Sequence, residues 1–207
     1  MPTFFLFIKL KTMSCDISNG RIEACKSSTS GIKACYIINY DKLNSDSVSY
    51  ETGTGQEDVI DFWNPIDDTV SLNLYKFELK SNSNSFTQSI ESSRDNGTTF
   101  FTQTLVINLK KQDAVTTKNV KLLAYGRPRI VVRSMTDQFF LVGLDQGADV
   151  SAGEISTGAA LGDFNGYSLT FTAQEELPAN FIDVTNEAGL KTAFATVSGA
   201  DAAIVTS

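Results

Sequence analysis

Apolar and polar residues alternate at a period of two along most of this chain, and turn-forming residues interrupt the alternation at short intervals. The clearest run covers residues 167–173, in which the odd-numbered positions are apolar and the even-numbered positions carry hydroxyl groups. Successive side chains of a strand point to opposite faces, so this run predicts a strand with one buried and one solvated face. Such half-buried strands are typical of antiparallel sheets.

The apolar positions of residues 70–79 change phase midway. They fall first on one face and then on the other: Val70, Leu72 and Leu74, followed by Tyr75, Phe77 and Leu79. A strand that keeps one buried face cannot change phase without an irregularity. We therefore expect a β-bulge or a change of packing partner near Leu74.

Residues 85–109 predict a long hairpin. Two alternating arms flank the turn sequence Arg94, Asp95, Asn96 and Gly97, and Asn-Gly is a strong hairpin signal because both residues tolerate a positive φ. With Thr98 the same residues form a glycosylation sequon, but the absence of a secretory signal favours the turn. The arms are rich in Ser, Thr, Asn and Gln, so we expect the hairpin to project from the body of the protein.

One helix is predicted over residues 113–125, with Asp113 as the N-cap and Gly126 as the C-terminal stop. We expect Val115, Leu122 and Leu123 to face a core. Apolar strands are predicted at residues 130–132 and 139–144, joined by a turn at residues 136–137. A loop rich in Gly, Ala and Ser is predicted at residues 147–162, and a loop or weak strand at residues 44–58.

These elements predict a mainly β fold, an antiparallel β-sandwich or barrel with one short α-helix and extended N- and C-terminal arms. We divide the chain into an N-terminal arm of residues 1–30, a β domain of residues 31–182 and a C-terminal arm of residues 183–207. The C-terminal arm has no strong period. Two interpretations remain open for it, a loose tail and an arm that becomes ordered on a neighbouring subunit.

The N-terminal arm contains an apolar run at residues 4–8 that is too short to span a bilayer. Lys9 and Lys11 follow this run, whereas a secretory signal carries its positive charges before the apolar region. No other segment approaches a membrane span, so we expect a soluble protein. Because Met13 begins an ordinary start sequence, we interpret residues 1–12 as an upstream extension or an arm that packs on a neighbour.

The composition is typical of a folded protein, and the chain contains no histidine. Of 207 residues, 42% are hydrophobic and 10% aromatic, which suits one domain with a sizeable core. The absence of His excludes Ser-His-Asp and Cys-His catalysis and His-ligated metals. A net charge of −7 argues against a basic surface that grips nucleic-acid phosphates.

The cysteines give no sign of a metal site or a disulfide framework. Cys15, Cys25 and Cys35 are evenly spaced by ten residues, whereas metal ligands come in close pairs, and their number is odd. We interpret them as reduced thiols, which indicates synthesis in a reducing compartment.

Several motifs resemble functional sites, and we interpret each of them structurally. Residues 163–166 resemble the start of a calcium loop, but no acidic residue follows at the closing position, so a tight turn is favoured. The acidic pairs at residues 67–68 and 175–176 are expected to be solvated surface, and Trp63 is expected in the core or a subunit contact rather than as a sugar platform. The sequence therefore predicts no catalytic residue, cofactor or metal site, and no enzyme.

The stretch of residues 157–171 resembles tail tube proteins, also called major tail proteins, of long-tailed bacteriophages. The resemblance is strongest to those from phages of Bacteroides-like bacteria and extends over about residues 15–182. The hairpin and the short helix before the strand at residue 130 occur in the same order. The residues that carry the motif are Gly158, Gly162, Asp163, Phe164, Asn165, Gly166 and Tyr167.

The resemblance implies a structural virion protein that is made in the host bacterial cytoplasm and assembles into rings, usually hexamers. The rings stack into the tube through which DNA is ejected. Its partners would be copies of itself, other tail proteins, and genomic DNA that passes without specific binding, with no membrane contact. Negative charge on the lumen would repel DNA phosphates. Candidates for the lumen are Asp58, Asp61, Asp67, Asp68, Glu78 and Glu91.

Within this interpretation, the hairpin tip at Arg94, Asp95, Asn96 and Gly97 is expected to contact the next ring. Two alternatives stay open. One is a receptor- or carbohydrate-binding β-module of a tail tip or fibre that uses Trp63 and the loop at residues 147–162. The other is the inner tube of a contractile injection system.

Overall fold

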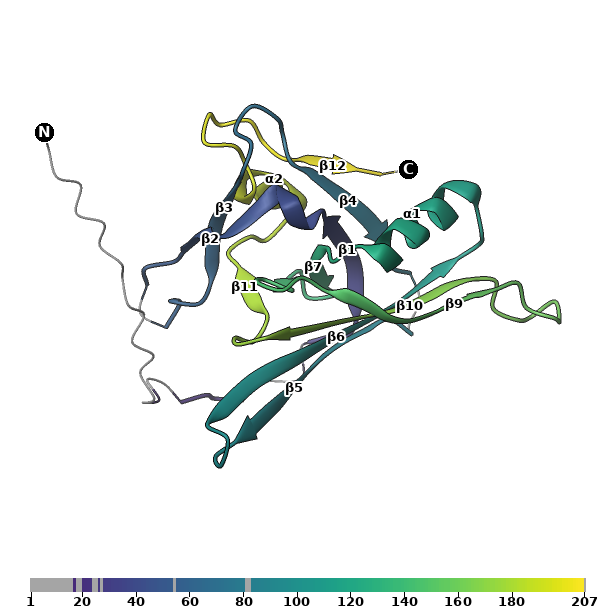
Figure 1. The fold of residues 1–207 in the computed structure, drawn as a ribbon, viewed down its shortest axis with the longest axis horizontal. Helices are drawn as coiled ribbons and strands as arrows, with labels where there is room; N and C mark the ends of the chain where they lie inside the picture. The colour runs from purple at the N-terminus through teal and green to yellow at the C-terminus, as the bar shows by residue number, and fades with distance from the viewer. Residues whose placement is uncertain are drawn as a thin grey trace, which may run out of the picture.

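Two β-sheets and two helices make up the fold (Figure 1). The computed structural model describes residues 17, 20–23, 26, 28–53, 55–80 and 83–206. The larger sheet has the order β12-β4-β1-β7-β8-β11-β3-β2 and the smaller one the order β5-β6-β10-β9. The strands of the larger sheet are β1 (Ile32–Ile38), β2 (Leu43–Tyr50), β3 (Ile60–Pro65), β4 (Asn73–Glu78), β7 (Arg129–Ser134), β8 (Phe139–Val142), β11 (Asn180–Ile182) and β12 (Ala203–Val205). The remaining elements are β5 (Ser85–Ser93), β6 (Thr98–Lys110), β9 (Asp149–Ser156), β10 (Gly166–Glu175), the 3-10 turn η1 (Tyr40–Lys42), α1 (Ala114–Tyr125) and α2 (Glu187–Ala193).

The first core lies between the two sheets. Side chains of β1 and β7 pack there against side chains of β6 and β10, and Val120 of α1 joins them. The predicted alternation of β10 is confirmed: Tyr167, Leu169, Phe171 and Ala173 are all buried in this core. The fold is thus the mainly β sandwich that the sequence predicted.

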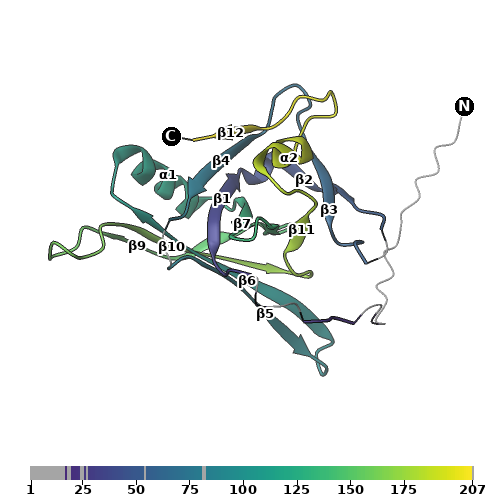
Figure 2. The same ribbon diagram turned by 180° about the vertical axis from the view of Figure 1, so that it is seen from behind.

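The second core lies on the opposite face of the larger sheet, which curls around α2 (Figure 2). Leu190 and Phe194 from the C-terminal region pack there against Trp63 of β3 and Leu74 of β4. The Trp63 and Phe194 ring centroids are 6.4 Å apart. The centre of the larger sheet is therefore buried on both faces.

This double burial explains the change of phase at residues 70–79. Leu72 and Leu74 belong to the second core, whereas Tyr75 and Phe77 pack against the first. The pairing of β4 with β1 runs without a shift from Glu78 to Tyr75, so the strand changes its packing partner and contains no bulge there. Val70 precedes the strand and is exposed.

Helix α1 begins and ends as predicted. The Asp113 side chain accepts a hydrogen bond from the Thr116 backbone N–H, and the Gly126 N–H closes the last turn on the Leu122 carbonyl. The predicted core face is wrong for Val115 and Leu122, which are each 58% exposed. Leu123 packs against the sandwich as predicted, together with Val120.

The prediction of a loop at residues 147–162 is wrong for half of this range, because residues 149–156 form β9, which pairs with β10. Only residues 157–165 connect the two strands. Strand β9 is an edge strand with Val150 alone packed against the core, so it lacks the apolar alternation that would have revealed it. Residues 43–50 form the edge strand β2, which agrees with the expected loop or weak strand.

Residues 183–206, expected to form an extended arm, fold back onto their own chain. They form the second helix, which the sequence did not predict, and the parallel edge strand β12, which pairs with β4. Leu190, Phe194 and Ala202 are buried, so the second core requires this segment. The predicted N-terminal arm lies mostly outside the described residues.

We expect the substitution Phe194→Ala to lower the free energy of unfolding by about 3–5 kcal/mol, because it removes a fully buried ring from the second core. Urea unfolding followed by fluorescence would measure the change. Val197→Ala is the matched control, since that side chain is 75% exposed, and should change stability by less than about 0.5 kcal/mol. Equal stabilities for the two variants would contradict a structural role for the C-terminal segment.

Candidate assembly surfaces

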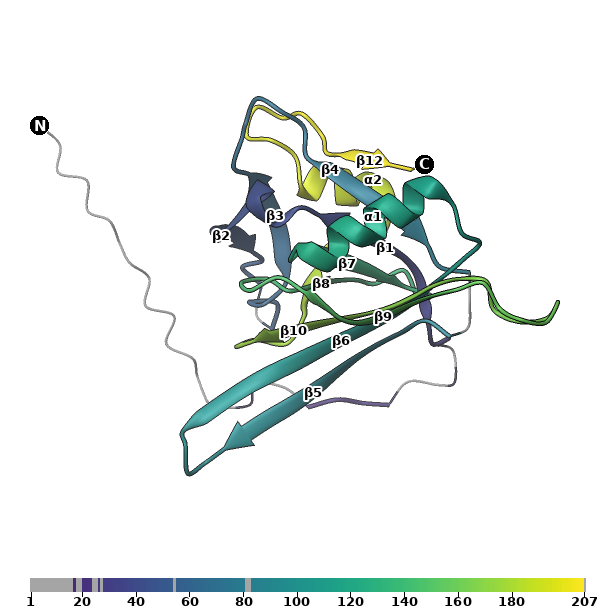
Figure 3. The ribbon, with the colours of Figure 1, turned by 45° about the vertical axis from the view of Figure 1, so that its right-hand side comes forward.

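The predicted hairpin is formed by β5 and β6, which pair without a shift from Ser85 and Val106 to Ser93 and Thr98. Residues 94–97 form its turn, with Gly97 at a φ of 64°. Figure 3 shows the hairpin extending past the rest of the molecule. The distal hairpin, residues 89–99, is almost entirely exposed and includes Ile90 at 68%.

Two glutamines fix the base of this hairpin, and sequence analysis did not single them out. Gln103 is buried; its Nε2 donates to the Leu177 carbonyl at 3.3 Å and its Oε1 accepts from the Gly143 N–H at 3.1 Å. The Gln88 Oε1 accepts from the Ala179 N–H at 2.7 Å. A polar strand residue that bonds to a distant loop leaves no periodic signal in the sequence.

The family-like motif forms the loop between β9 and β10 and the start of β10. The Asp163 Oδ2 accepts from the Ala159 and Ala160 N–H groups at 2.9 and 2.7 Å, which makes the expected tight turn. The bonds from Ala160 and Ala159 lower the pKa of the Asp163 carboxyl. Leu161 in this turn is fully exposed, and Phe164 is 41% exposed.

Gly166 and Tyr167 connect this loop to helix α1. A Cβ on Gly166 would lie 2.0 Å from the Leu109 carbonyl oxygen, so only glycine fits. The Tyr167 hydroxyl donates to the Asp113 carbonyl at 2.9 Å and accepts from the Asp113 N–H at 3.1 Å. The end of the motif therefore positions the N-terminus of α1.

The hairpin tip and the motif loop lie at opposite ends of the smaller sheet. Gly166, which follows the loop, pairs with Lys110 at the end of β6, whereas the hairpin turn precedes Thr98 at its start. The structure therefore gathers the motif residues into one place and keeps the hairpin residues away from them. Figure 1 shows the two projections on opposite sides of the core.

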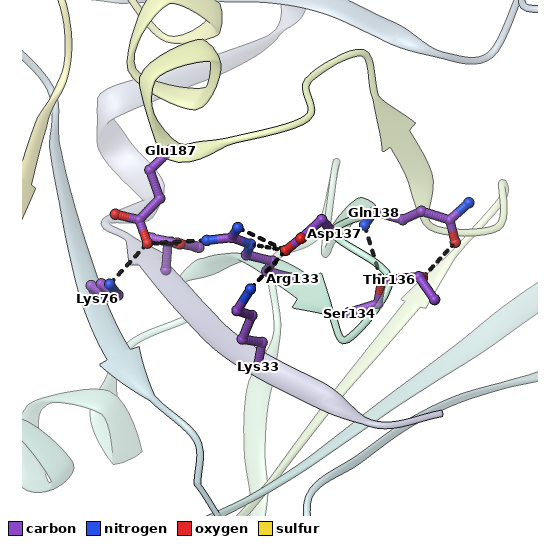
Figure 4. Close-up of polar contacts among 9 residues, drawn as sticks. Lys33, Lys76, Arg133, Ser134, Thr136, Asp137, Gln138 and Glu187 are labelled. Carbon is purple, nitrogen blue, oxygen red and sulfur yellow. Dashed lines mark hydrogen bonds and ion pairs between the residues drawn. The ribbon is translucent and has the colours of Figure 1, made fainter. Parts of the chain in front are cut away.

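A network of charges fastens α2 to the larger sheet (Figure 4). The Glu187 Oε1 accepts from the Lys76 Nζ and the Tyr36 hydroxyl, each at 2.8 Å, and from the Arg133 NH1 at 3.3 Å. Arg133 also binds the Asp137 carboxylate at 2.7 Å. The network therefore joins the three strands β1, β4 and β7 to helix α2.

Arg129 is buried without contacting a carboxylate directly. It donates to three backbone carbonyls, those of Tyr40, Leu43 and Leu144, at 2.6–2.8 Å. Its guanidinium lies over the Trp63 ring at 4.9 Å. Trp63 is fully buried, which confirms that it is a core residue and leaves no surface on which a sugar could stack.

Glu175 corrects the expectation that both acidic pairs are solvated. It is 5% exposed and its carboxylate accepts from the Asp145 and Gln146 N–H groups. Burial raises the pKa of this carboxyl. Glu176, Asp67 and Asp68 are exposed as expected.

The described residues contain no cluster of three or more His, Cys, Asp or Glu side chains able to hold a metal ion. Cys35 is fully buried, which raises the pKa of its thiol to about 12. Cys15 and Cys25 lie outside the described part of the chain. No helix within that part is long and apolar enough to cross a membrane.

Comparisons with protein-family models, with curated proteins and with solved structures found no match to this chain. The resemblance to tail tube proteins therefore rests on the residues of the sequence alone.

The Glu187 network predicts a pH-dependent contribution to stability. Partial burial opposes ionisation, but hydrogen bonds from Lys76 and Tyr36 and the nearby cations outweigh it and lower the pKa of the Glu187 carboxyl. A carboxyl whose pKa is lowered on folding stabilises the fold above its unfolded-state pKa, and this stabilisation is lost as the pH falls through the folded-state value. We expect Glu187→Gln to lower the free energy of unfolding by about 1–2 kcal/mol at pH 7.

Urea unfolding at a series of pH values would measure this effect, and the difference from the wild type should shrink below about pH 4. Glu154→Gln, at an exposed position of β9, is the control and should change stability by less than about 0.5 kcal/mol. A Glu187→Gln difference that stayed constant down to the lowest pH would contradict the proposed role of the charge.

Proposed function

We propose that this chain is a structural subunit that assembles into stacked rings and forms the tail tube of a bacteriophage. The sequence resemblance implies rings of six subunits. The observation that carries the proposal is the smaller sheet, which has free edges and extends beyond the core at both ends. The sequence resemblance supplies the kind of assembly. The role proposed is non-catalytic.

The free edges favour side-by-side association. Strands β5 and β9 end the smaller sheet and β2 and β12 end the larger one, and no other strand of the described residues pairs with their outer sides. Open strand edges invite pairing with other chains. A ring satisfies each edge with the next copy through a heterologous interface that closes on itself.

The two projections favour contacts between rings. The distal hairpin has no core of its own, and exposed Ile90 gives it an apolar contact point. The motif loop at the opposite end exposes Leu161 and Phe164. If copies stack in one direction, the distal hairpin of one copy faces the motif loop of the next, so the two projections can form the contact between rings.

The acidic surface is compatible with a DNA conduit. Asp58, Asp61, Asp67, Asp68 and Glu91 are exposed, as a lumen position requires. Glu78 is a weaker candidate because Lys76 and Lys80 lie 3.6 and 3.0 Å from its carboxylate oxygens. Negative charge on the lumen would repel DNA phosphates and keep the polymer moving.

The structure weakens one of the two alternative functions and leaves the other unchanged. A carbohydrate-binding module would need a surface other than Trp63, which is buried, and other than residues 149–156, which form β9. The inner tube of a contractile injection system requires the same free edges and projections, so it remains the second candidate.

Negative-stain electron microscopy of the full chain over a range of protein and salt concentrations tests the proposal. We expect rings or tubes of uniform width, with Ile90→Asp shortening tubes while rings persist, because it places a charge on the distal hairpin. Val197→Asp, at a similarly exposed position of the C-terminal segment, is the control and should leave tube length unchanged. Monomers under every condition would refute the assembly function.

A further inference from the structure

A row of aromatic rings lies open where the edge strand β5 meets the larger sheet. The ring centroids of Phe86 and Phe140 are 6.0 Å apart, and those of Phe140 and Phe181 are 4.6 Å apart. Phe181 is 45% exposed, and nearby Met135 is 50% exposed. We call Phe86, Phe140 and Phe181 the aromatic row.

A groove of 600 Å³ adjoins this row. Half of its lining residues are apolar and come from both sheets and from the turn after β7: Ile32, Leu79, Phe86, Val132, Met135 and Phe140. The other half are polar residues and a glycine, and they include Lys80 and Asn84. Its volume falls in the range of pockets that enclose small ligands. Phe181 of the row is exposed, whereas Phe86 and Phe140 are half-buried. The groove and the row together form a partly apolar surface that another segment can cover.

An acidic cluster of Glu51, Asp61 and Asp183 lies at the far end of the row. Ile182 of β11 pairs with Ile60 of β3, and both are buried in the second core. The adjoining residues Phe181, Asp183 and Asp61 therefore point to the other face of the sheet. The Glu51 N–H donates to the Val59 carbonyl and the Asp183 N–H donates to the Ile60 carbonyl, which places both residues beside Asp61 at the start of β3. Loss of surrounding water and the carboxylates of Asp61 and Asp183 raise the pKa of the Glu51 carboxyl.

We propose that the aromatic row and its groove bind the apolar run of residues 4–8, Phe-Phe-Leu-Phe-Ile, of a copy of this chain. This run lies outside the described residues. It is the longest apolar stretch of the N-terminal arm, and its three phenylalanines match the apolar half of the groove lining.

The length of the chain allows this contact. Ser30 and Gly31 line the groove, and the Gly31 carbonyl accepts from the Met135 N–H at 3.0 Å, so the chain enters the sandwich beside the proposed site. The mainly polar linker of residues 9–29 joins the run to this point. The root-mean-square end-to-end distance of a coil of about 20 residues is roughly 25 Å, which suffices to return the run to the groove or to reach a neighbouring copy.

Charge complementarity sets the direction of the contact. Lys9 and Lys11 immediately follow the apolar run, and the acidic cluster immediately follows the aromatic row. A run that lies along the row with its C-terminal end toward β11 brings these opposite charges together. The proposal does not depend on tube formation, because the contact can form in unassembled protein.

Disulfide trapping in dilute, unassembled full-length protein tests the contact directly. Phe7→Cys is combined with Met135→Cys in a chain whose Cys15 and Cys25 are replaced by Ser, while buried Cys35 is kept. The matched control combines Phe7→Cys with Val70→Cys, since Val70 is 59% exposed on the loop before β4. Under mild oxidation by oxidised glutathione, we expect the Met135 pair to cross-link at least tenfold faster than the control pair.

The mass of the cross-linked product distinguishes the two sources of the run. A linked single chain assigns the contact to the run of the same copy, and a linked dimer assigns it to a neighbouring copy; either supports the site. Equal cross-linking rates for the Met135 and Val70 pairs would overturn the proposal, whatever electron microscopy shows about rings.

Hydrogen exchange provides a second measurement that needs no cysteines. Amides of residues 134–141 and 179–183 should exchange several-fold faster in a chain that lacks residues 1–12 than in the full chain. The double variant Lys9→Glu and Lys11→Glu should show part of this increase at low salt and less of it at high salt, because screening weakens the repulsion from the acidic cluster. Identical exchange in the full and shortened chains would count against the site.

Discussion

The structure depends on the burial of the larger sheet on both of its faces. Strand β1 shows this most clearly, because Cys35 and Ile37 face the first core while Tyr36 and Ile38 face the second. A strand without a solvated face needs a covering layer on each side. The smaller sheet provides one layer and the C-terminal segment with α2 provides the other.

Polar groups at the layer boundaries are satisfied within the chain. Arg129 donates to backbone carbonyls around the second core, and Glu187 joins α2 to three strands. No buried side-chain nitrogen or oxygen of the described residues lacks a hydrogen-bond partner. The buried polar side chains of that part of the chain therefore need no partner chain to complete their hydrogen bonds.

The sequence predicted the elements whose signal is local. Strand β10 has a strict alternation, the hairpin has an Asn-Gly turn, and α1 has Asp113 and Gly126 at its ends. It did not predict β9, in which Val150 alone packs against the core, or α2 and β12, which are held by contacts with distant strands. Glu175 was misplaced for the same reason, since its partners come from another loop and leave no trace in its own neighbourhood.

The length of β6 connects the two projecting ends of the smaller sheet. This strand runs for 13 residues from the hairpin turn to the region of α1, a span of roughly 43 Å. Gln103 holds its middle through a hydrogen bond to the Gly143 N–H, and Gly166 pairs with Lys110 at its far end. Because residues 101–106 of β6 pair with both β5 and β10, the hairpin and the motif loop are joined through one continuous strand.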